Sequence, residues 1–470
     1  MTGAQITTGA GESFDIRSRS LWLDQLGDIA PRPPLTGNTT ADIVIIGGGF
    51  TGLWTALHLA KRRQDARIVV LERHVVGFGA AGRNGGWCGA GLAGSAKLYA
   101  KSAGWKRTLD GARLFETAID EIGRVIDEEG IAADFVKGGT LVVATTEPQW
   151  ARLQNSHAAA VRSGLAEPGA RLLSADEVRA MVRTPSVSGG LFTPHCARFQ
   201  PARLVRGLAE ACVRRGVVIH EQSSVTSIES GLARTQLGAV RADTVLRATE
   251  AWTGQLPRSG APYLPLTSMM IATEPLPSTV WDELGWPHGL TIRDRRHLFF
   301  YAQRTADDRI AIGGRGAPYR LRDPLAEFSE RDRPVWRRLE ETLRAHFPQV
   351  RGAAITHRWG GALAVPRDWS MSVAWNPDTR VGTAGGYGGH GIVAAYAAGR
   401  GLADLVTGHH TDYSAAAWVG HRSRRWEPEP LRYLAATAIV RILNGADRHE
   451  DRTGRTAERI RLLGPVLPPG

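Results

Sequence analysis

One short segment, residues 42–72, constrains the fold of this chain more than any other. DIVII at 42–46 has the composition of a buried parallel strand, and the glycine turn GGGFTG follows it directly. Apolar residues then recur at helical spacing, and RIVVL at 67–71 predicts a second buried strand. A strand, a glycine turn, a helix and a strand within about thirty residues form a βαβ unit. Glu72 stands at the end of its second strand, 20 residues past Gly52.

The glycines of this turn have the spacing of a dinucleotide site. In such a unit Gly47 would permit the tight turn, Gly49 would let the backbone approach a pyrophosphate, and Gly52 would let the helix pack closely on the strand. The helix N-terminus favours negative charge, and the Glu72 carboxylate can accept hydrogen bonds from ribose hydroxyls. We therefore predict dinucleotide binding; a purely structural glycine-rich turn is the alternative.

The remaining chain predicts an α/β fold with a second sheet outside the nucleotide-binding part. Between 263 and 316, short apolar runs alternate with turns, as expected of antiparallel strands. Ser174 and Glu177 stand at the positions of a helix-capping box. The other patterns predict helices over 108–129, 174–183, 202–215 and 332–347 and strands over 140–145 and 245–249. The first 40 residues look polar and irregular.

The charge of the chain does not point to one partner. Lys and Arg number 58 against 46 Asp and Glu, a formal net charge of +12. A nucleic-acid site would cluster these cations, but they are mixed with acids, as in RDR at 331–333. We therefore expect no nucleic-acid partner, while a charge-driven partner remains the alternative.

Cysteine content and hydropathy bear on the compartment. Three cysteines without CxxC spacing argue against a disulfide framework and against a metal site, so no metal is predicted. The N-terminus lacks a signal-peptide pattern, and no apolar run reaches the ~18 residues of a membrane helix. We expect a cytoplasmic protein without membrane insertion.

Three segments in order carry a resemblance to a known family. They are ADIVIIGGGFTGLWTALHLA at 41–60, VLERHVVGFGAAGRNGG at 70–86 and GYGGHGIVAAYAAGRGLADLV at 386–406. With them the chain resembles the D-amino acid oxidase/glycine oxidase (DAO) superfamily of FAD enzymes. SLWLDQLG at 20–27 and RWGGAL at 358–363 make it most similar to the gamma-glutamylputrescine oxidoreductase-like group.

The resemblance implies a Rossmann-like FAD-binding domain of the glutathione-reductase type and a discontinuous antiparallel-sheet substrate domain. We expect the boundaries to be a lead-in at 1–40, the FAD-binding domain at 41–135, 200–260 and 355–420, the substrate domain at 136–199 and 261–354, and a C-terminal helical extension at 421–470. The extension has an apolar helical face that could pack on the body or mediate self-association.

The resemblance also implies roles for particular residues. The glycine turn would hold the pyrophosphate, the loop after Gly77 the ribityl chain and isoalloxazine, and the late glycine cluster the flavin pyrimidine beside a helix N-terminus. The residues expected to bind FAD are Gly47, Gly49, Phe50, Thr51, Gly52, Glu72, Arg73, Ala81, Gly82, Arg83, Asn84, Gly85, Gly86, Val225, Ala248, Thr249, Gly388, Gly389, His390, Gly391 and Ile392.

The reaction implied by the resemblance is oxidation of a primary or secondary amine, such as an amino acid or polyamine derivative. A hydride passes from the carbon next to nitrogen to flavin N5, and the resulting imine hydrolyses. Tyr301, Trp359 and His390 fall where the family places its active site, although for Tyr301 and Trp359 ordinary core packing is the alternative. A tRNA-modifying flavoprotein and a non-catalytic flavin-fold binding protein are the competing functions.

Several positions depart from the family pattern. Many sarcosine-oxidase-like relatives activate oxygen with a lysine near the flavin, and this chain has no lysine after Lys137. The electron acceptor, oxygen or another compound, therefore stays open, as does the oligomeric state. Glu250 replaces a small or amide residue, which leaves the substrate side uncertain. Cys88 follows the second segment, but a buried thiol is the commoner role, so we predict non-covalent FAD.

Overall fold

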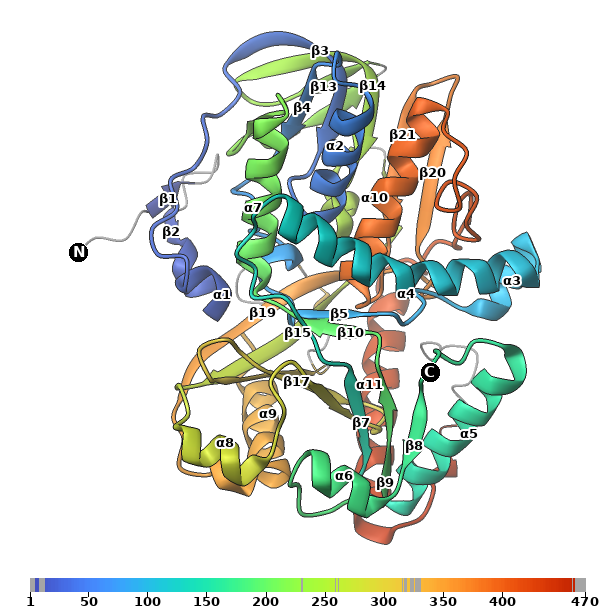
Figure 1. The fold of residues 1–470 in the computed structure, drawn as a ribbon. Helices are drawn as coiled ribbons and strands as arrows, with labels where there is room; N and C mark the ends of the chain where they lie inside the picture. The colour runs from blue at the N-terminus through green and yellow to red at the C-terminus, as the bar shows by residue number, and fades with distance from the viewer. Residues whose placement is uncertain are drawn as a thin grey trace.

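Two large sheets organise the molecule, one toward each end of the view in Figure 1. The computed structural model describes residues 5–7, 13–229, 231–257, 259–260, 262–314, 316, 319–321, 325, 331–458 and 460. Between the large sheets lies a small third sheet, built from β5 (Trp87–Gly89), β10 (Cys196–Arg198) and β6 (Val136–Lys137). Helices α3 (Ala96–Ala103) and α4 (Trp105–Glu128) run beside it.

The first large sheet contains the βαβ unit that the sequence predicts. Its strands are β11 (Val218–His220), β4 (Ile68–Leu71), β3 (Gly37–Ile46), β14 (Gly238–Arg247), β13 (Leu232–Arg234) and β12 (Ser227–Glu229), in that order. β21 (Val381–Gly385) pairs with β14, and β20 (Ser372–Asn376) with β21. β3 is parallel to both β4 and β14. Its last four residues are fully buried because α2 (Phe50–Arg62), α7 (Pro201–Arg214) and α10 (Gly391–Thr407) pack beside the sheet.

The second large sheet is mainly antiparallel. Its order is β19 (Ile355–Val365), β15 (Leu264–Thr273), β18 (Ile310–Gly314), β17 (Phe300–Arg304), β16 (Thr291–Asp294), β7 (Thr140–Ala144), β9 (Gly189–Thr193) and β8 (Arg171–Leu173). The exception is β16, which is parallel to β7. A core that includes Trp281 and Phe347 joins α8 (Ser278–Leu284) and α9 (Arg333–His346) to this sheet. Residues 355–365, which we expected in the FAD-binding domain, form β19 of this second sheet.

Two further helices cover the other end of the second sheet. They are α5 (Glu147–Ser163) and α6 (Ala175–Met181), and they contact β9. The capping box predicted for Ser174 and Glu177 is present at the start of α6. Short 3-10 helices include η2 (Ala80–Gly82), η3 (Glu250–Gln255) and η5 (Pro348–Val350).

The N-terminal lead-in is more ordered than the sequence predicts. After β1 (Gln5–Thr7) and β2 (Ser13–Asp15) come η1 (Ile16–Arg19) and α1 (Leu21–Asp24). Trp22 is buried, and its Nε1 donates a hydrogen bond of 2.8 Å to the carbonyl oxygen of Asn84. The expectation of a wholly irregular segment is therefore wrong for 16–24, because its apolar side chains pack under the loop that follows Gly77.

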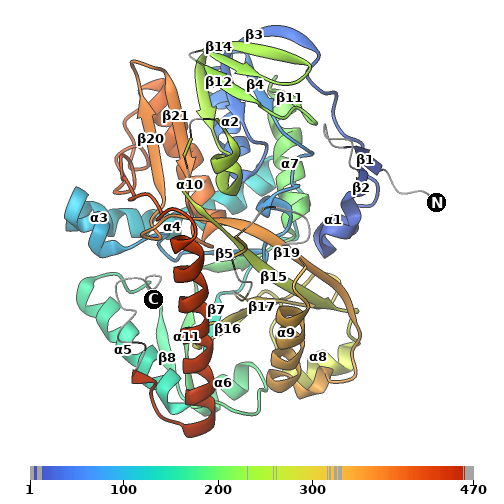
Figure 2. The same ribbon diagram turned by 180° about the vertical axis from the view of Figure 1, so that it is seen from behind.

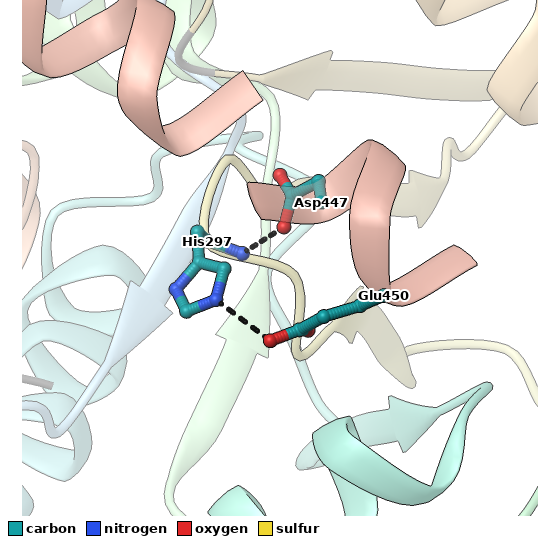
Figure 3. A group of neighbouring side chains, drawn as sticks. All are labelled: His297, Asp447 and Glu450. Atoms are coloured by element: carbon teal, nitrogen blue, oxygen red, sulfur yellow. Dashed lines mark hydrogen bonds and ion pairs between the residues drawn. The ribbon is translucent and has the colours of Figure 1, made fainter. Parts of the chain in front are cut away.

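The C-terminal helix α11 (Leu431–Thr453) packs back on the body, along the second sheet (Figure 2). Figure 3 shows its contact with the turn between β16 and β17. Asp447 accepts hydrogen bonds from the backbone amides of His297 (2.8 Å) and Leu298 (3.0 Å). Glu450 binds Arg152 through both oxygens (3.0 and 3.1 Å) and lies 3.2 Å from His297 Nε2. We call Asp447, Glu450, Arg152 and His297 the clasp.

The clasp also brings together three side chains of metal-ligand type, but their polar atoms are already engaged within the protein. Possible ligand atoms of His297, Asp447 and Glu450 lie within 4.8 Å of one another. A cation here would have to displace the Arg152 guanidinium from Glu450, so the geometry is that of an ion-paired support. Among the described residues, no helix is both long and apolar enough to cross a membrane.

Candidate active site

A cavity of about 730 Å³ is lined by residues of both large sheets and of the loops between them. The turn after β3, Glu72 at the end of β4, and Val225 all line it. Tyr301 of β17 and the N-terminus of α10 line it as well. Segments far apart in the sequence therefore meet around one space.

The glycine turn has the shape that a bound pyrophosphate needs. Gly47 has φ +108°, and a Cβ atom there would overlap the carbonyl oxygen of Ala248. A Cβ atom at Gly52 would overlap the carbonyl oxygen of Gly47, so only glycine lets α2 begin this close to β3. At Gly49 the nearest atom to a Cβ would be 3.9 Å away, and the residue faces the cavity. The empty space beside Gly49 is thus available to a ligand.

Glu72, which the sequence predicts to bind ribose, lies beside this turn. Its Oε2 accepts a hydrogen bond from the Gly48 amide (2.8 Å), and its Oε1 accepts one from the His74 amide (2.9 Å). Burial raises the pKa of the Glu72 carboxyl group above its ordinary value, while these two amides act in the opposite direction. Beside it, Arg73 Nη1 donates to Gln255 Oε1 at 2.5 Å.

The loop after Gly77 is fixed by hydrogen bonds within it and by others from Trp22, Trp359 and Gln303. Asn84 Nδ2 donates to the carbonyl oxygens of Ala80 (3.0 Å) and Ala81 (2.9 Å), and its Oδ1 accepts from the Gly86 amide (2.8 Å). The Arg83 guanidinium lies 4.8 Å from the centre of the Phe78 ring. This rigid loop presents its backbone to the middle of the cavity.

The structure brings nearly all of the predicted cofactor residues to the cavity. Those that line it are Gly47, Gly49, Phe50, Thr51, Glu72, Arg73, Ala81, Arg83, Asn84, Gly85, Val225, Ala248, Thr249, Gly388, Gly389, His390, Gly391 and Ile392. Gly52, Gly82 and Gly86 are not among the lining residues. A side chain at any of the three would collide with the protein itself, with Gly47, Gly77 and Phe199 respectively, so their role is close packing behind the wall.

Tyr301 forms part of the opposite wall. It is paired in register with Arg293 of β16, which is paired with Val142 of β7, so the three side chains share one face of the sheet. All three line the cavity. The Tyr301 hydroxyl lies 3.0 Å from Ser268 Oγ, and its ring fills the space where a Cβ atom of Gly85 would stand.

The other two predicted catalytic residues are placed differently. His390 lines the cavity at the N-cap of α10, beside Gly91. Trp359 does not: it is buried behind the wall, where its Nε1 donates to the carbonyl oxygen of Arg83 (2.9 Å) and its ring meets Trp22 edge to face. We correct its expected catalytic role to a supporting one, because its polar atom is used to hold the loop.

Sequence reasoning missed several residues of the cavity. The Tyr387 hydroxyl lies 2.8 Å from Thr51 Oγ1 and so joins α2 to the late glycine cluster. Glu250, noted only as a departure, has φ +43° and accepts a hydrogen bond from the Gly386 amide (2.9 Å). Burial raises its pKa to about 7. Arg293 and Glu167 also line the cavity, and no local motif marks either of them.

Two features weighed in the sequence lie outside the cavity. None of the five lysines, all within the described part of the chain, is among its lining residues. Cys88 is buried in the main core, and burial raises the pKa of its thiol well above the ordinary value. A flavin tether at Cys88 therefore finds no support in its position.

Together these features define a flavin-dinucleotide protein. A glycine turn at a helix N-terminus, a carboxylate 20 residues beyond it, a glycine-lined middle and a second helix N-terminus suit a ligand with a pyrophosphate and two separated ring systems. The residues present thus fit FAD.

Comparison with known proteins gives the family. The model of the family DAO, "FAD dependent oxidoreductase", matches residues 42–405, and the chain belongs to this family. The gamma-glutamylputrescine oxidoreductase of Escherichia coli (strain K12) is 32% identical over 401 residues, which cover 83% of this chain and 89% of the relative. The probable oxidoreductase OrdL of Haemophilus influenzae is 30% identical, with 83% and 88% covered.

Solved structures support the fold. The glycine oxidase from Geobacillus kaustophilus matches with a TM-score of 0.69 and 21% identity over 82% of this chain and 100% of that one. The L-proline dehydrogenase from P. horikoshii matches with a TM-score of 0.65 and 19% identity over 82% and 98%. The predicted fold class, the family and the FAD cofactor are thereby confirmed, and the chain is an FAD-dependent oxidoreductase.

Proposed function

We propose that this enzyme oxidises the carbon–nitrogen bond of a small amine, an amino acid or polyamine derivative, to an imine that hydrolyses. The observation that carries the proposal is the wall opposite the cofactor loop, where Tyr301 stands against Gly85 with Arg293 beside it. The similarity to gamma-glutamylputrescine oxidoreductase supports an amine substrate.

The residues at hand suit the tasks that such a reaction leaves to the protein. Bound FAD supplies the two-electron acceptor, so the chain must orient the amine, hold its proton and exclude water. Tyr301, fixed by Ser268, offers a hydroxyl that can hydrogen-bond the amine nitrogen. Arg293 offers a guanidinium for a carboxylate on the same substrate.

The N-terminus of α10 also faces the cavity. Gly388, Gly389 and His390 precede α10, whose N-terminal amides favour negative charge near them. The loop is fixed by Glu250 through the Gly386 amide. We infer that this end of the cavity stabilises charge that develops during reduction.

Anaerobic mixing of the holoenzyme with a panel of amines tests the proposal without assuming an acceptor. We expect at least one amine to bleach the visible absorbance of the oxidised flavin and to yield a carbonyl product. If dithionite bleaches the flavin but no amine of the panel does, the proposal is overturned. Oxygen, a quinone and a dye then identify the electron acceptor.

A further inference from the structure

One carboxylate of the cavity differs from the others in how its charge is compensated. Glu167 lies on the loop between α5 and β8 and lines the cavity. Its Oε2 is enclosed and has no hydrogen-bond partner among the described residues. The backbone amide of His195 acts on the same carboxylate. Glu167 therefore combines access to the cavity with an incomplete set of partners.

The other two carboxylates that line the cavity are satisfied by backbone amides. Glu72 accepts from Gly48 and His74, and Glu250 accepts from Gly386. On Glu167 a like charge, Glu116 of α4, acts more strongly than the His195 amide. The charge of Arg113 acts on Glu116, but within the part of the chain that the structure describes no ion pair joins Glu116 or Glu167 to a cationic side chain.

His195 does not supply the missing positive charge. Its pKa is lowered by burial and then by Lys137, which keeps the imidazole neutral at pH 7. Its Nδ1 is enclosed and, among the described residues, has no hydrogen-bond partner. Glu167 is half-buried, with Oε2 enclosed. An enclosed carboxylate oxygen without a partner is costly when ionised, so a cationic ligand would stabilise this corner.

We propose that Glu167 binds a second cationic group of the amine substrate, so that the preferred substrates are diamines or polyamine derivatives with two separated ammonium groups. Tyr301 is on β17, and β16 and β7 follow it in the sheet. Two strand spacings, about 10 Å, separate β17 from β7. Thr193, paired with Thr140 of β7, and His195 continue the wall to Glu167. The two ammonium groups must therefore be far apart.

A pH dependence accompanies this geometry. Burial, with the charge of Glu116, raises the pKa of Glu167 to about 7. A cation bound beside it lowers that pKa, so binding near pH 7 releases a proton. Binding of the second ammonium group should strengthen as pH rises from 6 to 8, because only the ionised carboxylate attracts it.

The inference rests on the proposed amine oxidation, and the test separates the two. Hexylamine, 1,6-diaminohexane and 6-aminohexanoic acid share one chain length and differ in the distal group. Flavin reduction by each is followed anaerobically in wild type, Glu167→Gln and Glu147→Gln, the last an exposed control on α5. A charged hydrogen bond contributes about 1.5–3 kcal/mol, so the diamine should be preferred over the monoamine about 10- to 100-fold in wild type at pH 8.

The outcomes differ clearly. We expect Glu167→Gln to abolish the preference for the diamine and the pH dependence of that preference. The rate of flavin reduction by hexylamine should not change. Glu147→Gln should match wild type. Equal treatment of diamine and monoamine by wild type overturns the inference even if Glu167→Gln does not fold, and so does a retained preference in Glu167→Gln. If no amine reduces the flavin, the proposed function fails instead.

Binding gives a second readout that needs no turnover. Titration calorimetry with hexamethonium, a dication without a reactive ammonium proton, is carried out in buffers of different ionisation enthalpy. Wild type should release a fraction of a proton per site near pH 7. Glu167→Gln should release none and bind about tenfold or more weakly, because the attraction between the carboxylate and the quaternary ammonium is lost. Equal affinity in the two proteins contradicts the proposed contact.

Discussion

The two walls of the cavity are built by different means. On the cofactor side, one run of about thirty residues supplies the glycine turn and Glu72, and glycines make up much of the lining. The opposite side is lined by side chains. Arg293 and Tyr301 lie next to each other only because β16 pairs with β7 and β17. At Gly47 and Gly52 the backbone itself leaves no room for an added side chain. The substrate wall, in contrast, can change its chemistry one side chain at a time.

The largest expected effect is the loss of FAD affinity when the glycine turn is altered. Gly49→Ala adds a methyl group where the protein has room, 3.9 Å from the nearest atom, but where the pyrophosphate must approach. We expect a folded protein that loses FAD, with affinity reduced 100-fold or more (roughly the effect of about 3 kcal/mol). Flavin absorbance and circular dichroism measure the two properties.

Two companion variants sharpen this result. Gly52→Ala would place its Cβ against the carbonyl oxygen of Gly47, so both folding and FAD content should suffer. Gly352→Ala has open space around it and should behave like wild type. Full FAD content in Gly49→Ala would show that the ligand does not approach the turn.

The next largest expected effect is a pH dependence of stability caused by Glu250, which lines the cofactor part of the cavity. The pKa of Glu250 is raised by burial from its ordinary 4.5 to about 7. Between these pH values the folded state holds a proton that the unfolded state has released, so stability decreases as pH rises through this window. The difference amounts to up to about 3 kcal/mol.

Urea unfolding of wild type and Glu250→Gln from pH 4.5 to 8 measures this loss. The variant keeps an acceptor for the Gly386 amide but cannot ionise, so its stability relative to wild type should increase as pH rises. A constant difference across the window would contradict the raised pKa. Exposed Glu147→Gln serves as the control.

Tyr301→Phe tests the substrate wall itself. It removes the hydroxyl that lies 3.0 Å from Ser268 Oγ but keeps the ring against Gly85. We expect kcat/KM for the best amine to fall about tenfold, since one hydrogen bond to the substrate is lost, with FAD content unchanged. Tyr319→Phe, which loses a hydrogen bond to Glu429 away from the cavity, should leave kcat/KM unchanged. An equal fall in both variants would argue against a role for Tyr301 at the substrate.

The same contrast explains which features the sequence could reveal. The glycine turn, Glu72 and the late glycine cluster are local patterns with a local physical reason, and the structure places them on the cavity. Arg293 depends on the pairing of Thr291 with Thr140, 151 positions earlier, which no periodicity encodes. Trp359 is an aromatic residue of the kind found in active sites, but its indole N–H donates to the carbonyl oxygen of Arg83. Strand order and loop packing decide which residues become neighbours in these cases, and composition alone does not predict them.

The smallest expected effect concerns the clasp, which supports only the substrate wall. Asp447 fixes the turn that joins Arg293 and Tyr301, whereas α11 supplies none of the residues that line the cavity. Asp447→Asn retains one acceptor oxygen, so about 1 kcal/mol of stability should be lost. We expect KM for the amine to rise about a few-fold, which corresponds to the loss of about one hydrogen bond. kcat and FAD affinity should stay unchanged.

The control for the clasp is Arg448→Gln, at an exposed position of the same helix, which should alter neither stability nor KM. A fall in FAD affinity in Asp447→Asn would mean that the turn between β16 and β17 also governs the cofactor side. The two walls would then be mechanically coupled, because the contact of Tyr301 with Gly85 would transmit a displacement of the turn to the loop after Gly77. Unchanged FAD affinity with raised KM would instead show that each wall is held by its own supports.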